Sequence, residues 1–316
     1  MKAPHLLQFT HDDPAATQAA LFASFRASTV AISPKYFYDA LGSRLFSAIT
    51  ELPEYYPART EAAIFAQYAG EMAEAIAPVS SLIDLGAGNC EKAAKLFAPL
   101  QVQRYVAVDI SVDYLHDSLE ALQRKHPVME MLGIGLDFSQ SLKLPAEVGA
   151  GPHTFFYPGS SIGNFTPDEA HHFLQQLHTA SQGGALLIGV DLVKSTEILE
   201  RAYDDPLQIT AAFNRNLLRH LNQQVGSDFN IDDWRHIAYF NTSDSRIEMH
   251  LEAVRGNVLH WPEGERHFKT GERIHTENSY KWQRDDFASL LESAGFKRLQ
   301  SWIDERGWFA VFLAFA

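Results

Sequence analysis

The chain has 316 residues, of which 46% are hydrophobic and 21% are charged, so it can bury a sizeable core and is not disordered. Its 39 acidic residues outnumber its 26 basic residues, and the net charge of −13 disfavours binding to nucleic acid or to an anionic membrane. The single cysteine, Cys90, excludes an intrachain disulfide and a multi-cysteine zinc site. The N-terminal residues lack a secretory signal and the longest apolar run, 308–316, is too short to span a membrane, so we expect a cytoplasmic protein.

Short apolar runs and amphipathic stretches alternate through the middle of the chain. Strands are predicted at 81–85, 104–109, 131–136, 154–157 and 185–190. Helices are predicted between them at 91–97, 112–125 and 167–180. The second helix ends before Pro127 and the third before Gly183-Gly184, which are ordinary stop signals. This alternation favours an α/β fold with a Rossmann-like, doubly wound parallel sheet.

The C-terminal segment predicts an addition to this sheet. A helix at 285–294 ends at Gly295. The apolar runs at 296–303 and 308–315 flank a polar turn, which is typical of a hairpin. A terminal antiparallel hairpin would add a reversed strand to the parallel sheet.

Two segments lack the strand–helix alternation. Residues 1–60 contain helical and proline-containing pieces, and residues 196–224 predict one long helix. Strand patterns follow at 236–240, 246–254 and 273–282. We therefore expect a second, α+β domain from residues 1–60 and 196–283, and a discontinuous sheet domain from residues 61–195 and 284–316.

The most distinctive local motif is the loop from Asp84 to Lys92, which follows the first predicted sheet strand and opens a helix. Its glycines, Gly86 and Gly88, let a ligand approach the backbone, and the helix N-terminus offers N–H groups. Glu91 stands where a dinucleotide-binding loop has its third glycine, and its charge would oppose a pyrophosphate. The loop therefore favours S-adenosylmethionine, a phosphate-free cofactor with a cationic sulfonium, over NAD or a nucleotide sugar.

Two further acidic residues follow neighbouring strands. Asp109 ends the second strand, where a carboxylate can accept hydrogen bonds from ribose hydroxyls. Asp137 and Phe138 end the third strand, where the acid can meet the adenine amino group and the ring can pack on adenine. The alternatives are an ordinary glycine-rich turn at the loop and a helix N-cap at Asp137.

Several longer segments carry a family resemblance. They lie, in chain order, at 36–43, 52–61, 159–167, 191–194, 201–205, 211–216, 246–249 and 276–281. Together they resemble the L-histidine Nα-methyltransferases of ergothioneine biosynthesis. The resemblance implies a Rossmann-like methyltransferase sheet and an enzyme that uses S-adenosylmethionine to methylate the α-amino nitrogen of histidine three times, giving hercynine. The sequence departs from the family pattern at Asp84, where glutamate is expected, and at Asn89-Cys90, which replace small hydroxyl residues.

The resemblance also implies roles for individual residues. The cofactor-binding positions are Gly86, Lys92, Asp109, Asp137 and Phe138, to which the glycine motif adds Gly88. The substrate-binding positions are Tyr55, Asn164, Tyr203, Glu277 and Ser279, with Tyr38 and Met249 lining the same pocket. The second domain would then be the substrate-binding domain.

The chemistry of methyl transfer needs a neutral amine aligned with the activated methyl group. A nearby sulfonium and burial both lower the pKa of the amine, so no strong general base is required. We expect Tyr38 and Asn164 to be catalytic, with Tyr38 relaying the proton. Asn164 and Tyr203 can donate hydrogen bonds to the substrate carboxylate. Alternatively, Tyr38 belongs to a packed aromatic cluster, Asn164 caps a helix and Tyr203 lies on a helix surface.

Recognition of a neutral imidazole requires one acceptor and one donor. Glu277 can accept from the ring N–H and Ser279 can donate to the other nitrogen. They are two residues apart on a predicted strand and so face the same way, although an exposed polar strand would show the same pattern. The trimethylammonium group of the product can pack on Tyr38, Tyr55 and Phe213.

Other functions remain open from sequence. The chain can be an Nα-methyltransferase of another amino acid, such as tryptophan, or a non-catalytic S-adenosylmethionine-binding module. The expected partner is a small amino acid, with no nucleic acid, no membrane and a monomeric chain. The 14 histidines include no HExxH arrangement, so we expect no metal.

Overall fold

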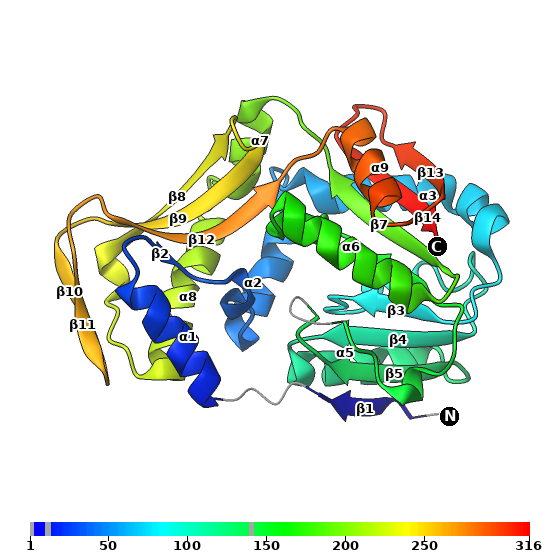
Figure 1. Ribbon diagram of the computed structural model, residues 1–316, viewed down its shortest axis with the longest axis horizontal. Helices are drawn as coiled ribbons and strands as arrows, with labels where there is room; N and C mark the ends of the chain where they lie inside the picture. The colour runs from blue at the N-terminus through cyan, green and yellow to red at the C-terminus, as the bar shows by residue number, and fades with distance from the viewer. Residues whose placement is uncertain (1–2, 10–13, 139–141) are drawn as a thin grey trace. The chain divides into compact units, whose positions relative to one another are not determined.

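The computed structural model describes residues 3–9, 14–138 and 142–316, and its elements form two units (Figure 1). Unit 1 comprises Met1–Thr10, Pro57–Val193 and Lys281–Ala316, and unit 2 comprises His11–Tyr56 and Lys194–Tyr280. The predicted domain boundaries lie a few residues from these, except that residues 3–9 lie in unit 1 and not with the remainder of residues 1–60. The assignment of cofactor to one domain and substrate to the other stays a prediction.

Unit 1 is built on a mixed sheet with the strand order β1-β5-β4-β3-β6-β7-β14-β13 (Figure 1). Its strands are β1 (His5–Gln8), β3 (Leu82–Leu85), β4 (Arg104–Asp109), β5 (Glu130–Gly135), β6 (Thr154–Tyr157), β7 (Ala185–Asp191), β13 (Arg298–Ile303) and β14 (Phe309–Phe315). The strands from β1 to β7 in this sheet run parallel, whereas β14 is antiparallel to β7 and to β13. The predicted parallel sheet with a reversed terminal hairpin is therefore confirmed. The strand β1 was not predicted.

The helices of this unit follow the predicted alternation. They are α3 (Tyr56–Ile76), α4 (Glu91–Ala94), α5 (Val112–Lys125), α6 (Pro167–Ser181) and α9 (Arg284–Ser293), with short 3-10 turns at Ala146–Val148 and Ser161–Asn164. α6 begins with a capping box in which Thr166 and Glu169 satisfy each other's backbone N–H groups. Its left-handed C-cap is Gln182 rather than the predicted glycine. The helix predicted at 91–97 was too long, because residues after Ala94 continue in turns closed by i→i+3 bonds.

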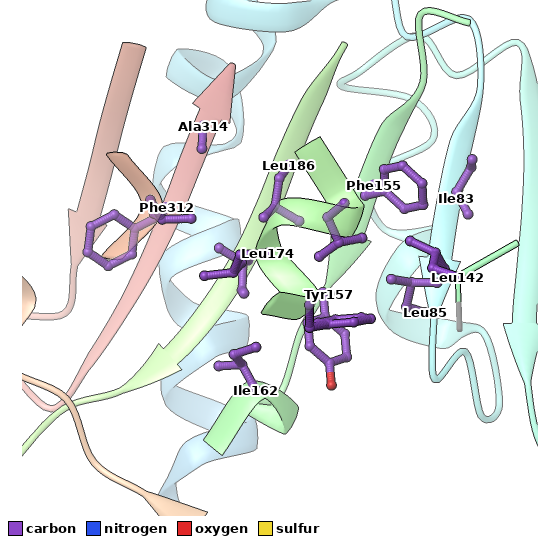
Figure 2. Packing of buried hydrophobic residues seen from close by; sticks show 14 of the residues in the cluster. Ile83, Leu85, Leu142, Phe155, Tyr157, Ile162, Leu174, Leu186, Phe312 and Ala314 are labelled. Atoms are coloured by element: carbon purple, nitrogen blue, oxygen red, sulfur yellow. The ribbon is translucent and has the colours of Figure 1, made fainter. Parts of the chain in front are cut away.

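Both faces of the sheet are buried, which explains why its strands read as continuous apolar runs. Ile83 and Phe155 point to one face, where they pack with side chains of α6 and α9 (Figure 2). Their neighbours Leu82 and Phe156 point to the other face, where they pack with side chains of α3, α4 and α5. The alternation of side chains along each strand thus builds two core layers around one sheet.

Unit 2 contains a sheet with the order β2-β12-β9-β8 and a separate hairpin. The elements are α1 (Pro14–Arg26), β2 (Val30–Ala31), α2 (Ala40–Thr50), α7 (Thr196–Tyr203), α8 (Ile209–Val225), β8 (Trp234–Asn241), β9 (Arg246–Ala253), β10 (Asn257–Trp261), β11 (Gly264–Phe268) and β12 (Arg273–Tyr280), with 3-10 turns at Pro34–Phe37 and Ile231–Asp233. α7 and α8 contact β8 and β9 (Figure 1). The three strands predicted after residue 235 are confirmed as β8, β9 and β12.

Two features of unit 2 differ from the prediction. The helix predicted over 196–224 is broken into α7 and α8, because Pro206 lacks an N–H group and Asp205 accepts hydrogen bonds from the N–H groups of Ile209 and Thr210. The hairpin β10–β11 was not predicted. It is held by Trp261, whose ring lies 6.1 Å from Phe22 of α1, a contact that local sequence does not reveal. Within the described part of the chain, no helix is both long enough and apolar enough to cross a membrane.

Candidate active site

The glycine loop lies at the point where the strand order of the sheet reverses. From β3 the chain continues to β4 and β5 on one side and to β6 and β7 on the other. The carboxyl ends of β3 and β6 therefore flank the crevice in which parallel sheets bind their ligands. Gly86 and Gly88 have φ angles of 70° and 52°, in the left-handed region that glycine adopts without strain. A Cβ atom on Gly86 would meet only the Phe138 ring, at 4.0 Å, so the loop leaves space above its backbone.

Asp109 shapes this loop from the neighbouring strand. Its Oδ2 accepts a hydrogen bond from the Gly88 N–H and its Oδ1 accepts one from the Ser111 N–H, both at 2.9 Å. Desolvation raises the pKa of Asp109, while these backbone N–H groups act in the opposite direction. The carboxylate is thus fixed at the end of β4, where the predicted ribose contact would be made.

Phe138 forms one wall beside the loop, and Asp137 precedes it after β5. The Phe138 ring lies 5.9 Å from both Tyr157 and Phe173, edge-on to the first and stacked on the second. Aromatic packing therefore fixes the ring near Gly86, on the side where adenine was predicted.

Lys92 is joined to a buried carboxylate for which no role was predicted from the sequence. Its Nζ lies 2.8 Å from Oε2 of Glu61 on α3, and Oε1 of Glu61 accepts a hydrogen bond of 2.7 Å from the Gly159 N–H after β6. The Glu61 side chain is 1% exposed and the Lys92 side chain is 41% exposed. Glu61 ends one of the segments that carry the family resemblance, so that segment is the signal by which it could have been found.

Asp84 and Cys90 are buried beneath the loop. The Tyr105 hydroxyl donates a hydrogen bond of 2.7 Å to Asp84. Burial raises the pKa of Asp84 to about 7, against the lowering effects of Tyr105 and Lys92. Burial also raises the pKa of the Cys90 thiol to about 12, so this cysteine is not an activated nucleophile.

Asn164 ends the 3-10 turn that follows β6. The N-cap of α6 is Thr166, so the alternative interpretation of Asn164 as that cap is wrong. The side chain is neither fully buried nor fully exposed, at the carboxyl end of the sheet. Its position is that of a ligand-contacting residue in parallel sheets, and its role stays a prediction.

The predicted substrate residues of unit 2 include a directly bonded pair. The hydroxyl groups of Tyr203 and Ser279 lie 2.8 Å apart, and the ring of Tyr55 lies 6.2 Å from that of Tyr203. Tyr203 is 7% exposed, so the alternative that it lies on a helix surface is wrong. Glu277 precedes Ser279 by two residues on β12 and is paired with Met249 on β9, so Glu277 and Ser279 share one face of the sheet.

Aromatic side chains from residues 38–55 and from α8 meet beside this pair. Phe213 of α8 lies 5.8 Å from Tyr38 and 5.9 Å from Phe46 of α2, and Phe46 lies 6.2 Å from Tyr55. Phe213 is 2% exposed, which makes it the buried base of the cluster. Tyr38 therefore does pack in an aromatic cluster, as the alternative interpretation held, yet it belongs to the same cluster as Tyr55. Phe46 was not predicted, because it lies three residues beyond the segment 36–43 that carries the family resemblance.

One group of metal-ligating side chains comes together in the described residues, namely Glu248, His250 and His275, with ligand atoms within 4.8 Å of one another. Burial alone would raise the pKa of Glu248, but hydrogen bonds hold it well below its usual value. The donors are Tyr239, Asn241, Arg246 and His250. The Arg246 guanidinium already forms an ion pair with this carboxylate, which a cation would have to displace.

Comparison with known proteins gives the family. Residues 17–316 match the family described as histidine-specific methyltransferase, SAM-dependent. The chain is 37% identical over 305 residues to the histidine N-alpha-methyltransferase of Mycobacterium tuberculosis, covering 93% of each protein. It is 38% identical over 303 residues to the protein of the same name from Mycolicibacterium smegmatis, covering 92% of each. The chain belongs to the SAM-dependent, histidine-specific methyltransferases.

A longer protein is similar to this methyltransferase over about a third of the longer protein's own length. Ergothioneine biosynthesis protein 1 of Neurospora crassa is 30% identical over 275 residues, which are 84% of this chain and 31% of that protein. Within the methyltransferase, unit 1 holds the predicted cofactor residues and Asn164, while unit 2 holds the other predicted substrate residues.

Proposed function

We propose that this enzyme transfers three methyl groups from S-adenosylmethionine to the α-amino nitrogen of L-histidine, producing hercynine for ergothioneine biosynthesis. The relatives that support this proposal are named for histidine Nα-methylation and for ergothioneine biosynthesis. The observation that carries it in the structure is the hydrogen bond between buried Tyr203 of α7 and Ser279 of β12, the strand that also presents Glu277.

The residues of unit 1 fit the cofactor. Gly86 and Gly88 keep the backbone accessible, Phe138 offers an aromatic wall, and Lys92 presents an ammonium group that suits the carboxylate of the cofactor. Asp109 presents a fixed carboxylate that suits the ribose hydroxyls. S-adenosylmethionine supplies an electrophilic methyl group when bound.

The residues of unit 2 fit a histidine side chain. The Glu277 carboxylate accepts a hydrogen bond from the imidazole N–H, and the Ser279 hydroxyl donates one to the other ring nitrogen. Tyr203 orients the Ser279 hydroxyl through their shared hydrogen bond. The aromatic cluster of Tyr38, Tyr55 and Phe213 provides ring faces on which a methylated ammonium can pack.

The reaction requires the amine to lose its proton before it attacks. A positive charge close by and burial away from water both favour the neutral amine, so proton removal needs a relay rather than a strong base. Tyr38 is the proposed relay, because its hydroxyl-bearing ring lies in the cluster with Phe213. Asn164 is proposed to donate a hydrogen bond that holds the substrate carboxylate, a role tested by its alanine variant.

A panel of amino acids with methyl-labelled S-adenosylmethionine tests the function. We expect histidine alone to gain three methyl groups by mass spectrometry, with three equivalents of S-adenosylhomocysteine formed. Label on tryptophan in place of histidine would reject the substrate but keep the chemistry. If no amino acid releases S-adenosylhomocysteine, the chain is a binding module.

A further inference from the structure

The carboxylate of Glu61 connects the two loops that flank the reversal of strand order. One oxygen contacts Lys92, in the helix after β3, and the other accepts from the Gly159 N–H after β6. Glu61 itself is on α3, remote in sequence from both loops. A single side chain therefore sets the spacing of the groups on either side of the ligand crevice.

Two glycines provide the space for this ion pair. A Cβ atom on Gly189 of β7 would lie 2.0 Å from Oε1 of Glu61, a separation that cannot exist. A Cβ atom on Gly159 would lie 3.2 Å from Nζ of Lys92, closer than most Cβ contacts. The absence of a side chain at Gly189 leaves room for Glu61 in the interior. The absence of one at Gly159 leaves room for Lys92 beside the turn after β6.

The pair is asymmetric in its exposure. Glu61 is almost completely buried, and burying a carboxylate is unfavourable unless its oxygens are paired, as both are here. Lys92 has three N–H donors and a side chain that is 41% exposed, so its ammonium can contact Glu61 and a ligand carboxylate together. Such an arrangement fixes a flexible lysine in one direction before the ligand arrives.

We infer that Glu61 is a positioning residue that holds the Lys92 ammonium group in place to bind the carboxylate of the methionine part of S-adenosylmethionine. The inference rests on the proposed role of Lys92 in cofactor binding. Glu61 acts through Lys92 and touches neither the methyl group nor the amine. Its loss should therefore weaken binding of the amino-acid end of the cofactor and leave the adenosine end unaffected.

The experiment compares two ligands by isothermal titration. S-adenosylhomocysteine has the carboxylate, whereas 5′-methylthioadenosine retains the adenosine and the thioether but lacks the whole amino-acid group. We expect Glu61→Gln to weaken S-adenosylhomocysteine about tenfold, as for loss of one charge-assisted contact, with 5′-methylthioadenosine unchanged. In turnover, the KM for S-adenosylmethionine should rise by about the same factor, with the KM for histidine changing less than about twofold.

Matched variants distinguish the loss of Lys92 positioning from a non-specific effect of removing a charge from α3. Glu74→Gln removes the same charge from an exposed position of α3 and should alter neither affinity. Lys92→Gln should weaken S-adenosylhomocysteine selectively, and adding Glu61→Gln to it should cost nothing further, because the two residues act as one unit. If Glu61→Gln does not fold, Glu61→Asp takes its place, since it keeps the charge but is too short to reach both partners.

An equal loss for both ligands would overturn the inference, since it would make Glu61 a structural residue only. No loss for either ligand would overturn it as well. Failure of the proposed function is a separate result: the selective loss of S-adenosylhomocysteine binding can be observed even if histidine is not methylated.

Discussion

At the scale of single residues, Glu277 gives the most direct test of imidazole recognition. It is paired with Met249 and shares a strand face with Ser279, which is 4% exposed. Glu277→Ala should raise the KM for histidine about tenfold to a hundredfold, because a charged acceptor for the ring N–H is lost, with little change in the KM for S-adenosylmethionine. Glu265→Ala, at an exposed position of β11, is the control. Equal effects on both substrates would show that Glu277 is structural.

Asp84 predicts a pH dependence of stability. Its pKa is raised from 3.8 to about 7, mainly by burial, so the folded chain holds this proton more tightly than the unfolded chain does. Between about pH 4 and pH 7 the contribution of Asp84 to the free energy of unfolding must therefore fall as pH rises, by up to about 1.4 kcal/mol per pH unit. Above pH 7 both states are ionised and this contribution is constant.

Asp84→Asn removes that dependence while keeping an oxygen that can accept from Tyr105. Relative to the parent chain, the variant should gain stability as pH rises from 5 to 7. Urea unfolding at several pH values measures the difference. A constant difference over this range would contradict the assignment of the buried proton to Asp84.

At the scale of elements, one carboxylate stabilises the break that Pro206 also favours between α7 and α8. Asp205 is 1% exposed and accepts from the N–H groups of Ile209 and Thr210 at 3.0 and 2.8 Å. Asp205→Ala should lower the free energy of unfolding by about 2 kcal/mol, as for loss of a helix cap in a buried position. The exposed neighbour Asp204, changed to alanine, should have little effect.

The pKa of Asp205 also predicts how the difference in the free energy of unfolding between the parent chain and Asp205→Ala varies with pH. Burial would raise the pKa of Asp205, but the hydrogen bonds from Thr210 and Ile209 lower it below its usual value. The stabilising effect is thus complete above the ordinary aspartate pKa and is lost as pH falls through the lower, folded-state pKa. Urea unfolding should show the parent and Asp205→Ala converging below about pH 4; a gap that persists there would contradict the capping role.

Elements with a strong local pattern could be predicted from sequence, and those held by distant contacts could not. β4 and α5 match their predicted ranges residue for residue, because a continuous apolar run and amphipathic spacing are local properties. β1 and β2 are short strands whose pairing partners, β5 and β12, lie far along the chain. Their own four and two residues contain too little pattern to distinguish a strand from a loop.

At the scale of the whole chain, one part of the predicted site likewise follows from local sequence, and the other part depends on contacts between distant residues. The glycine loop is contiguous in sequence, so its position after β3 follows from the strand–helix rhythm. Glu61 acquires its surroundings from Lys92, Gly159 and Gly189, which only the folded sheet brings together. The pairing of Tyr203 with Ser279 likewise joins residues from α7 and β12. The family resemblance supplied Tyr203 and Ser279, for which physical reasoning on the sequence alone left alternatives, but it gave no role to Glu61.

The whole enzyme should work without a metal ion. Transfer of a methyl group from a sulfonium to a neutral amine needs alignment and not a Lewis acid. The most suitable ligand group in the described residues has Glu248 already bonded to Arg246, so cation binding would have to break that ion pair. Prolonged dialysis against EDTA should leave kcat and both KM values unchanged, and elemental analysis should find no stoichiometric metal. Loss of activity that zinc or another divalent cation restores, and that His250→Ala abolishes, would refute this expectation and make the histidine pair a metal site.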